Sequence, residues 1–182
     1  MEIQNLLCKI AKILEELKIP YVVTGGVAVS VWGRPRFTAD IDIVVELITQ
    51  NISPLAKSLL KIDKDVYVSE EAMKDALERE GEFNFIHPQS RLKVDFWIVK
   101  DNFEKLKIKR GVSQKIGKQK IKFISPEDLI LSKLLWYKES FSTRHLEDIE
   151  SVMKISKLDL KYIKNWAEKQ STIKILEEVI KK

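Results

Sequence analysis

Two aspartates lie two residues apart in a segment that is otherwise apolar and rich in β-branched residues. The segment Asp40-Ile41-Asp42-Ile43-Val44-Val45 alternates as a strand does, and residues i and i+2 of a strand share one face. Two neighbouring carboxylates on a largely buried strand require a cation that neutralises them. Oxygen ligands favour hard divalent ions, so the pattern predicts a site for Mg²⁺, with Mn²⁺ as the alternative, completed by nucleotide phosphates.

A third carboxylate, Asp95, lies in a second apolar segment, Leu92 to Val99. This segment also reads as a strand. If it pairs beside the strand of Asp40 and Asp42, the three carboxylates converge on one face of the sheet. Three such groups are enough for a two-metal site.

A pair of glycines supplies the complementary part of a nucleotide site. Tyr21 to Val23 reads as a short buried strand, and Gly25-Gly26 follows it and opens a short helix over residues 27–32. Without side chains, the backbone N–H groups of such a turn can approach a phosphate closely. A metal-binding acidic face together with a phosphate-binding turn predicts chemistry on a nucleoside triphosphate.

The order and spacing of these motifs resemble a known superfamily. Gly25-Gly26, thirteen residues and then Asp40-Ile41-Asp42-Ile43 resembles the signature of the polymerase-beta-like nucleotidyltransferases, and Asp95 resembles their third carboxylate. The string GGVAVSVWGRPRFTADID, the helix start SPEDLILSKL and the stretch RHLEDI are similar to small AbiE-type toxin nucleotidyltransferases. The resemblance covers about residues 20–150.

This resemblance implies an enzyme that transfers NMP from an NTP to a hydroxyl or phosphate of an acceptor and releases pyrophosphate. The roles it implies are metal binding for Asp40, Asp42 and Asp95, phosphate binding for Gly25, Gly26, Arg36 and Thr38, and contact with the leaving pyrophosphate for Lys133. Asp95 is also a candidate base for the acceptor hydroxyl. The acceptor is either RNA such as tRNA, in a toxin-like role beside an antitoxin protein, or a small molecule.

Several features also have plainer explanations. A lysine such as Lys133 on a helix often only extends its charge to solvent. Asp148 and Arg144 are four residues apart, so an ordinary ion pair along one helix explains them equally well. At the level of the whole chain, the alternative to an enzyme is a catalytically silent protein of the same fold that binds nucleotide or a partner.

The periodicity of the chain predicts an α/β (α+β) protein with a small mixed sheet flanked by helices. Residues 1–124 form the expected nucleotidyltransferase core, and residues 125–182 form a C-terminal helical region packed on it. Expected helices cover residues 4–18, 53–61 and 69–80, expected strands cover 82–86 and 92–99, and the helical region is interrupted near 140–143, 156–159 and 170–172.

Positive charge is concentrated in one segment. The chain has 32 Lys and Arg against 27 Asp and Glu, a net charge of +5, and residues 105–122 hold eight of the basic residues and no acidic ones. We expect a hairpin there, with Gly111 or Gly117 near its turn. Its lysines either protect an exposed strand edge or form a surface on which an RNA acceptor lands.

Composition excludes several other classes of protein. Cys8 is the single cysteine, so no disulfide forms within the chain, and His87 and His145 are too few for a three-histidine zinc site. No apolar run reaches the length of about 20 residues that a membrane span requires. The charged N-terminal segment does not read as a signal peptide, so we expect a cytoplasmic protein without membrane contact.

Overall fold

The computed structural model describes residues 2–181, which form two compact units. The first unit comprises residues 2–27 and 37–124, and the second comprises residues 28–36 and 125–181. The sequence-based division placed all of residues 1–124 in one core. The contacts group the short segment 28–36 with the C-terminal helices, and the expected division at residue 124 stays a prediction.

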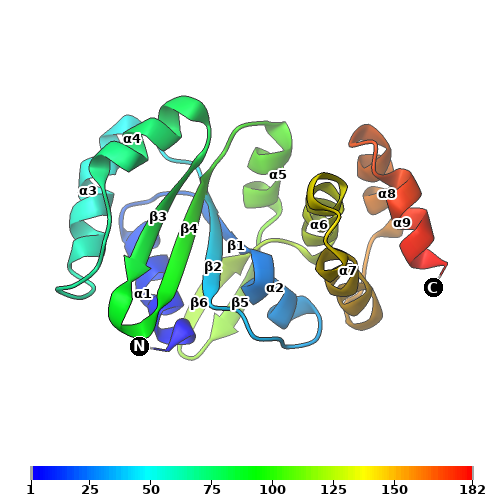
Figure 1. The fold of residues 1–182 in the computed structure, drawn as a ribbon, viewed down its shortest axis with the longest axis horizontal. Helices are drawn as coiled ribbons and strands as arrows, with labels where there is room; N and C mark the ends of the chain where they lie inside the picture. The colour runs from blue at the N-terminus through cyan, green and yellow to red at the C-terminus, as the bar shows by residue number, and fades with distance from the viewer. Residues whose placement is uncertain (1, 182) are drawn as a thin grey trace. The chain divides into compact units, whose positions relative to one another are not determined.

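The first unit is built on a six-stranded mixed sheet (Figure 1). Its strands are β1 (Tyr21–Thr24), β2 (Asp40–Val45), β3 (Glu82–His87), β4 (Leu92–Ile98), β5 (Val112–Ile116) and β6 (Gln119–Phe123), in the order β3-β4-β2-β1-β6-β5. β2 runs parallel to β4, and β1 runs parallel to β6, while the other neighbours are antiparallel. The helices of this unit are α1 (Ile3–Glu16), α3 (Thr49–Leu60), α4 (Glu70–Arg79) and α5 (Asn102–Arg110), with the 3₁₀ turn η1 (Pro88–Ser90) between β3 and β4.

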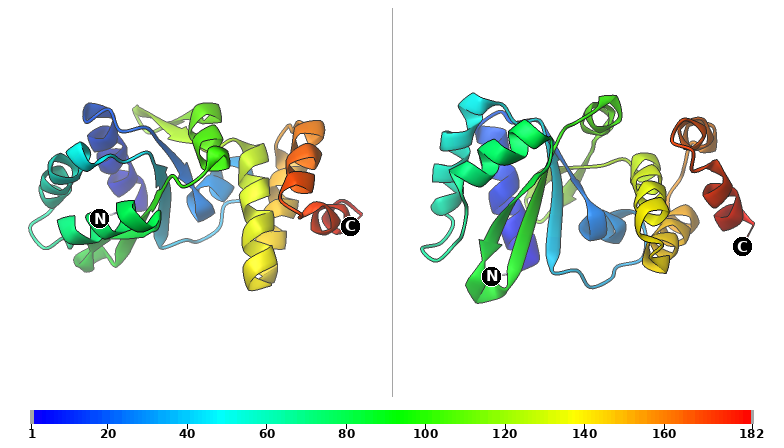
Figure 2. Two further views of the ribbon diagram at one scale, coloured as in Figure 1. Left: turned by 90° about the horizontal axis from the view of Figure 1, so that it is seen from above. Right: turned by 45° about the horizontal axis from the view of Figure 1, so that its top comes forward.

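The two faces of this sheet differ sharply. The inner face is apolar and buried, with residues such as Ile41, Ile43, Phe83, Val94 and Phe96 each at most 2% exposed. Helices α1, α3 and α4 lie on this side, as Figures 1 and 2 show, and α1 and α3 each bury an apolar stripe. The outer face carries the polar residues that alternate with this core, which is why strand alternation predicted them correctly.

The basic segment contains the expected hairpin and, before it, the end of a helix that the sequence did not predict. The expected hairpin is present as β5 and β6, joined at Gly117, and residues 102–110 form α5. Asp101 begins this helix because its Oδ1 accepts a hydrogen bond of 2.8 Å from the backbone N–H of Glu104. An acidic N-cap followed three residues later by glutamate is typical of a helix start.

The second unit is helical. It contains the C-terminal half of α2 (Gly25–Trp32) together with α6 (Pro126–Ser140), α7 (Thr143–Ile155), α8 (Leu160–Lys169) and α9 (Ile173–Ile180). The breaks between these helices fall where the sequence predicted them. No helix within residues 2–181 is long and apolar enough to cross a membrane.

Helix α7 binds the end of α2 and the loop after it. Ser151 Oγ accepts a hydrogen bond of 2.6 Å from the backbone N–H of Arg34, and Ser156 Oγ donates one of 2.7 Å to the carbonyl of Trp32. A Cβ on Gly33 would lie 2.6 Å from Ser151 Oγ, so the close approach requires glycine. These contacts fix the loop that carries Arg36.

Candidate active site

The carboxylates predicted from the sequence share the outer face of the sheet. β2 and β4 pair in parallel with Asp42 beside Asp95 and Asp40 beside Lys93. Residues in register on neighbouring strands point to the same side. Asp40 is exposed, Asp42 is partly buried, and Asp95 is 6% exposed.

Gly25 lies directly against Asp42. It adopts a left-handed backbone with φ +63°, and a Cβ built on it would stand 1.8 Å from Asp42 Oδ2. On its other side, Asp42 Oδ1 lies 3.4 Å from the indole Nε1 of Trp97, which donates to it. The glycine turn is therefore required for the position of this carboxylate, in addition to any role toward phosphate.

The start of α2 has a buried hydroxyl that lacks a protein partner. Thr24 pairs with Asp42 across β1 and β2 and is 1% exposed, and its Oγ1 has no hydrogen-bond partner among the described residues. An unsatisfied buried hydroxyl is costly unless a ligand or water satisfies it. Because Gly25 and Gly26 follow Thr24 directly, this hydroxyl lies at the turn where phosphate binding is expected.

Asp95 has its own partners within the protein. Lys93 Nζ lies 2.8 Å from Asp95 Oδ2, and Asn84 on β3 donates a hydrogen bond from Nδ2 to Oδ1. The hydrogen bond to Asp95 raises the pKa of Lys93 because it stabilises the ammonium form, and the charge of Asp40 raises that pKa further.

The donor set fits a hard cation only in part. Within residues 2–181, no group of three His, Cys, Asp or Glu side chains is close enough together to hold a metal ion. Asp40 and Asp42 offer the oxygen ligands that Mg²⁺ prefers. Asp95 would join them only on exchanging the ammonium of Lys93, so its predicted role as a ligand stays a prediction.

Thr38 has a local role in the structure. Its Oγ1 donates a hydrogen bond of 3.1 Å to the backbone carbonyl of Asp40. This hydrogen bond fixes the start of β2, where Asp40 is the first residue. The predicted contact of Thr38 with phosphate stays a prediction.

Arg36 and Lys133, both predicted to contact phosphate, meet at one buried carboxylate in the second unit. Arg36 Nε and one terminal nitrogen bind the two oxygens of Asp148 at 2.8 and 3.0 Å, and Lys133 Nζ lies 2.8 Å from Asp148 Oδ2. Asp148 is 3% exposed and Lys133 is 4% exposed. The interpretation of Lys133 as a solvated side chain is therefore wrong.

This cluster extends to an aromatic pair. Lys133 Nζ lies 4.8 Å from the centre of the Trp136 ring, and that ring is 5.8 Å from the ring of His145. Burial lowers the pKa of His145, and the nearby charge of Lys133 lowers it further. The Nδ1 of His145 has no hydrogen-bond partner among the described residues.

We expect the stability contributed by Asp148 to fall in acid. Burial alone would raise the pKa of this carboxyl, but the hydrogen bonds and charges of Arg36 and Lys133 outweigh it, and the net pKa lies below its ordinary value. A group whose pKa is lowered by folding stabilises the protein above its unfolded pKa of about 4 and loses this contribution as the pH falls further.

The measurement compares the free energy of unfolding of the wild type and Asp148→Asn across this pH range. The difference between the two proteins should be constant near neutral pH and should shrink as the pH falls from about 4 through the lower pKa of the folded state, below which Asp148 is neutral in both states. A difference that does not change with pH would contradict this assignment.

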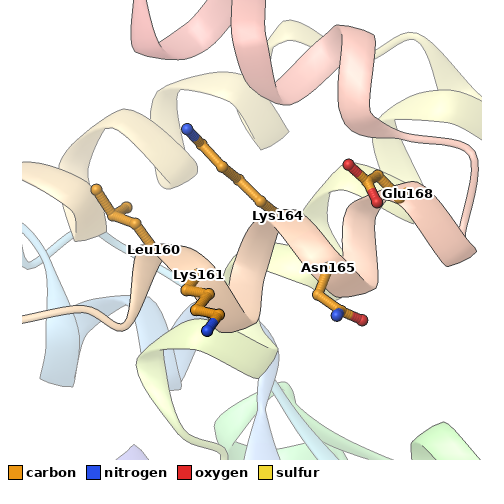
Figure 3. A pocket seen from close by; sticks show the side chains of 5 residues that line it. All are labelled: Leu160, Lys161, Lys164, Asn165 and Glu168. Atoms are coloured by element: carbon orange, nitrogen blue, oxygen red, sulfur yellow. The ribbon is translucent and has the colours of Figure 1, made fainter.

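Two hollows lie in the second unit. One, of about 410 Å³, is bounded by the loop of Arg34 and Arg36 and by Glu147, Asp148 and Lys154 of α7. The other, of about 430 Å³, runs along α8, and Figure 3 shows that all of its lining side chains, from Leu160 to Glu168, come from this single helix. Only the first hollow includes residues predicted from the sequence.

A mixed sheet with D-x-D on β2, an adjacent aspartate on β4 and a glycine turn after β1 defines a nucleotidyltransferase of the polymerase-beta-like superfamily. Over residues 1–182 the chain matches the family described as nucleotidyltransferase of unknown function, DUF6036, and it belongs to that family. No curated protein matches the chain in sequence. Membership of the AbiE-type subgroup stays a prediction.

Solved structures with the same fold are enzymes and enzyme-like proteins of this class. ANT(2")-Ia in complex with adenylyl-2"-tobramycin has 16% identity and a TM-score of 0.62, over 93% of this chain and 97% of that one. A nucleotidyltransferase-like protein from Paracoccidioides brasiliensis has 20% identity and a TM-score of 0.59, over 98% and 91%. Lincomycin-bound LnuA, a lincosamide antibiotic adenylyltransferase, has 16% identity and a TM-score of 0.55, over 86% and 98%.

Proposed function

We propose that this nucleotidyltransferase moves NMP from an NTP to an acceptor hydroxyl or phosphate in a Mg²⁺-dependent reaction that releases pyrophosphate. The observation that carries the proposal is the position of Asp42, which lies beside Asp95 on β4 and against Gly25 at the start of α2. Carboxylates and a glycine turn at one point of a sheet suit a nucleotide with its metal.

The residues of the first unit would have distinct roles in binding the nucleotide and in the reaction. Asp40 and Asp42 would hold the metal, and the N–H groups of Gly25 and Gly26 would face the β- and γ-phosphates. A bound Mg²⁺ would neutralise phosphate charge and favour deprotonation of the acceptor hydroxyl. Asp95 would take up the proton as the acceptor oxygen bonds to the α-phosphorus and the bond to the pyrophosphate oxygen breaks.

The acceptor is either a small molecule or an RNA such as tRNA, the latter in a toxin-like role that an antitoxin protein would control. Two proteins of the same fold are associated with small acceptors by their names, since ANT(2")-Ia holds an adenylylated tobramycin and LnuA binds lincomycin. The eight basic residues of segment 105–122 support the RNA alternative.

The proposal predicts that Asp40→Asn and Asp42→Asn each abolish turnover while the fold remains. A metal ion contributes several kcal/mol to the transition state, so losing a ligand should lower the rate of pyrophosphate release by at least about 100-fold. Each of the four NTPs is incubated with Mg²⁺, total tRNA and a set of small acceptors, and pyrophosphate is measured. Circular dichroism reports whether each variant is folded.

Asp75→Asn is the matched control, because Asp75 is exposed on α4, on the other side of the sheet. It should behave as the wild type. Unchanged pyrophosphate release in Asp40→Asn or Asp42→Asn would contradict the proposal. Nucleotide binding without pyrophosphate release, over the whole set of acceptors, would instead favour a catalytically silent binding protein.

A further inference from the structure

The outer face of the sheet is ordered in rows that the strand register defines. The middle row contains Asn84, Asp95, Asp42 and Thr24 on β3, β4, β2 and β1, and the row beside it contains Glu82, Trp97, Val44 and Val22 in the same strand order. On the other side of the middle row lie Ile86, Lys93 and Asp40, and Tyr67 pairs with Ile86 at the edge.

These rows place the two reactants on opposite sides of the carboxylates. Under the proposed function, on which this inference rests, the triphosphate lies at the Gly25 turn, which follows β1. In-line displacement requires the acceptor to approach the α-phosphorus from the side opposite the leaving pyrophosphate. The acceptor therefore approaches Asp95 from the side of β4 and β3.

The side of β4 and β3 has a distinctive surface, which we call the acceptor patch and define as Tyr67, Glu82, Asn84, Ile86 and Trp97. Three of its side chains are large and exposed, Tyr67 at 56%, Trp97 at 38% and Ile86 at 36%. The indole of Trp97 also reaches Asp42. Exposed aromatic faces beside the reacting groups offer a surface on which a ring can pack.

The acceptor patch is also electronegative. Glu82 lies directly opposite Trp97 and two residues from Asn84, which binds Asp95. Burial raises the pKa of Glu82, the charges of Asp95 and Asp42 raise it further, and the ammonium of Lys93 opposes them. A cationic ligand would relieve this repulsion, whereas a polyanion would increase it.

The lysines of the hairpin lie on the far side of β1. Lys122 lies beside Val22 on the outer face, and Lys115 pairs with Lys120. In the order β4-β2-β1-β6, Lys122 is three strand spacings from Asp95, about 14 Å. In the strand order these cations therefore lie across β1 from Asp95, and the parallel register puts them toward the start of β1, the end opposite the glycine turn.

We infer that the acceptor patch binds a small, hydroxylated ring compound that carries at least one ammonium group. Its ring packs on Trp97, its ammonium pairs with Glu82, and its reacting hydroxyl faces Asp95. The hydroxyl oxygen gains the bond to the α-phosphorus, its proton passes to Asp95, and pyrophosphate leaves with the electron pair of the broken P–O bond. Thr24, whose buried hydroxyl has no partner among residues 2–181, ends the same row on the triphosphate side.

The test uses the full chain with ATP, Mg²⁺ and one acceptor at a time: tobramycin, lincomycin, glucosamine, uncharged glucose, or total tRNA. Pyrophosphate release gives kcat and KM, and calorimetry gives direct binding of each small acceptor. At least one amine-bearing acceptor should support turnover, and glucose should not. Glu82→Gln should raise the KM for that acceptor about tenfold, the effect of losing one charge-assisted hydrogen bond, and leave kcat and the KM for ATP unchanged.

One control separates specificity from folding. Glu71→Gln removes an exposed carboxylate of α4 and should leave all constants unchanged.

Trp97→Leu, which keeps an apolar side chain, should also raise the KM for the acceptor. Because the indole of Trp97 donates to Asp42, the KM for ATP is compared only between the wild type and Glu82→Gln.

The outcomes distinguish this inference from the proposed function. One outcome is that tRNA is the single acceptor in the set that supports turnover, and that Lys120→Gln and Lys122→Gln reduce this turnover while Glu82→Gln does not. This outcome would overturn the inference and leave the proposed function standing. A second outcome is that an amine acceptor binds, that Glu82→Gln weakens this binding, and that no pyrophosphate is released. It would support the acceptor patch and count against the proposed reaction. If no amine acceptor binds or reacts, the inference is overturned.

Discussion

Replacing Asp148 by alanine is expected to lower the free energy of unfolding by about 3–5 kcal/mol, the usual cost of removing one partner from a buried ion pair. Asp148 is 3% exposed and binds Arg36 through both carboxylate oxygens and Lys133 through one. Without it, Lys133, which is itself 4% exposed, loses its contact with this carboxylate in a site that water barely reaches. Urea unfolding followed by circular dichroism measures the change.

Two further variants identify the cause. Glu147→Ala removes an exposed carboxylate next to Asp148 on α7, and its effect should remain within about 0.5 kcal/mol. Combining Lys133→Met with Asp148→Ala should cost less than the sum of the single changes, because the pair interacts directly. A loss below about 1 kcal/mol for Asp148→Ala, or full additivity of the pair, would show that this carboxylate does not hold the two cations together.

The fold was largely predictable because its core strands alternate and its helices have clear ends. Strand alternation placed β2 at residues 40–45, as observed, and Ser125 followed by Pro126 marked the start of α6. The hairpin expected within residues 105–122 is present, but the helix over residues 102–110 was not predicted. Lysines at the alternate positions 105, 107 and 109 resemble a strand with one basic face, whereas the backbone N–H of Glu104 donates a hydrogen bond to Asp101 Oδ1 and starts a helix. That capping signal was present in the sequence.

The site was predictable only where its residues are close in sequence or lie on neighbouring strands. The i, i+2 spacing of Asp40 and Asp42 puts both on one face, and the pairing of β2 with β4 brings Asp95 beside them. No local sequence pattern predicts that Arg36 binds Asp148, because the two residues are 112 positions apart in the chain. The ion pair between Lys93 and Asp95 was also not predicted, although the i, i+2 spacing of the two residues on β4 indicates that they share one face.

Gly25→Ala is expected to reduce the rate of nucleotidyl transfer by about 100-fold while the protein remains folded. Under the proposed function, Asp42 binds the metal, and a methyl group at residue 25 would occupy the space of its Oδ2, 1.8 Å from the built Cβ. Asp42 must then rotate away from its present position, and displacing a reacting group by about 1 Å can cost about 100-fold in rate. Pyrophosphate release with ATP, Mg²⁺ and an acceptor that supports turnover of the wild type measures the change.

Gly117→Ala separates this steric effect from backbone strain. Both glycines have positive φ, +63° for Gly25 and +59° for Gly117, so alanine costs each about 1–2 kcal/mol of stability. Nothing lies within 4 Å of a Cβ on Gly117, at the turn between β5 and β6. Gly117→Ala should therefore lose stability and keep its rate, and Gly25→Ala should lose both. Equal rates in the two variants would show that the position of Asp42 against the glycine turn is not needed for turnover.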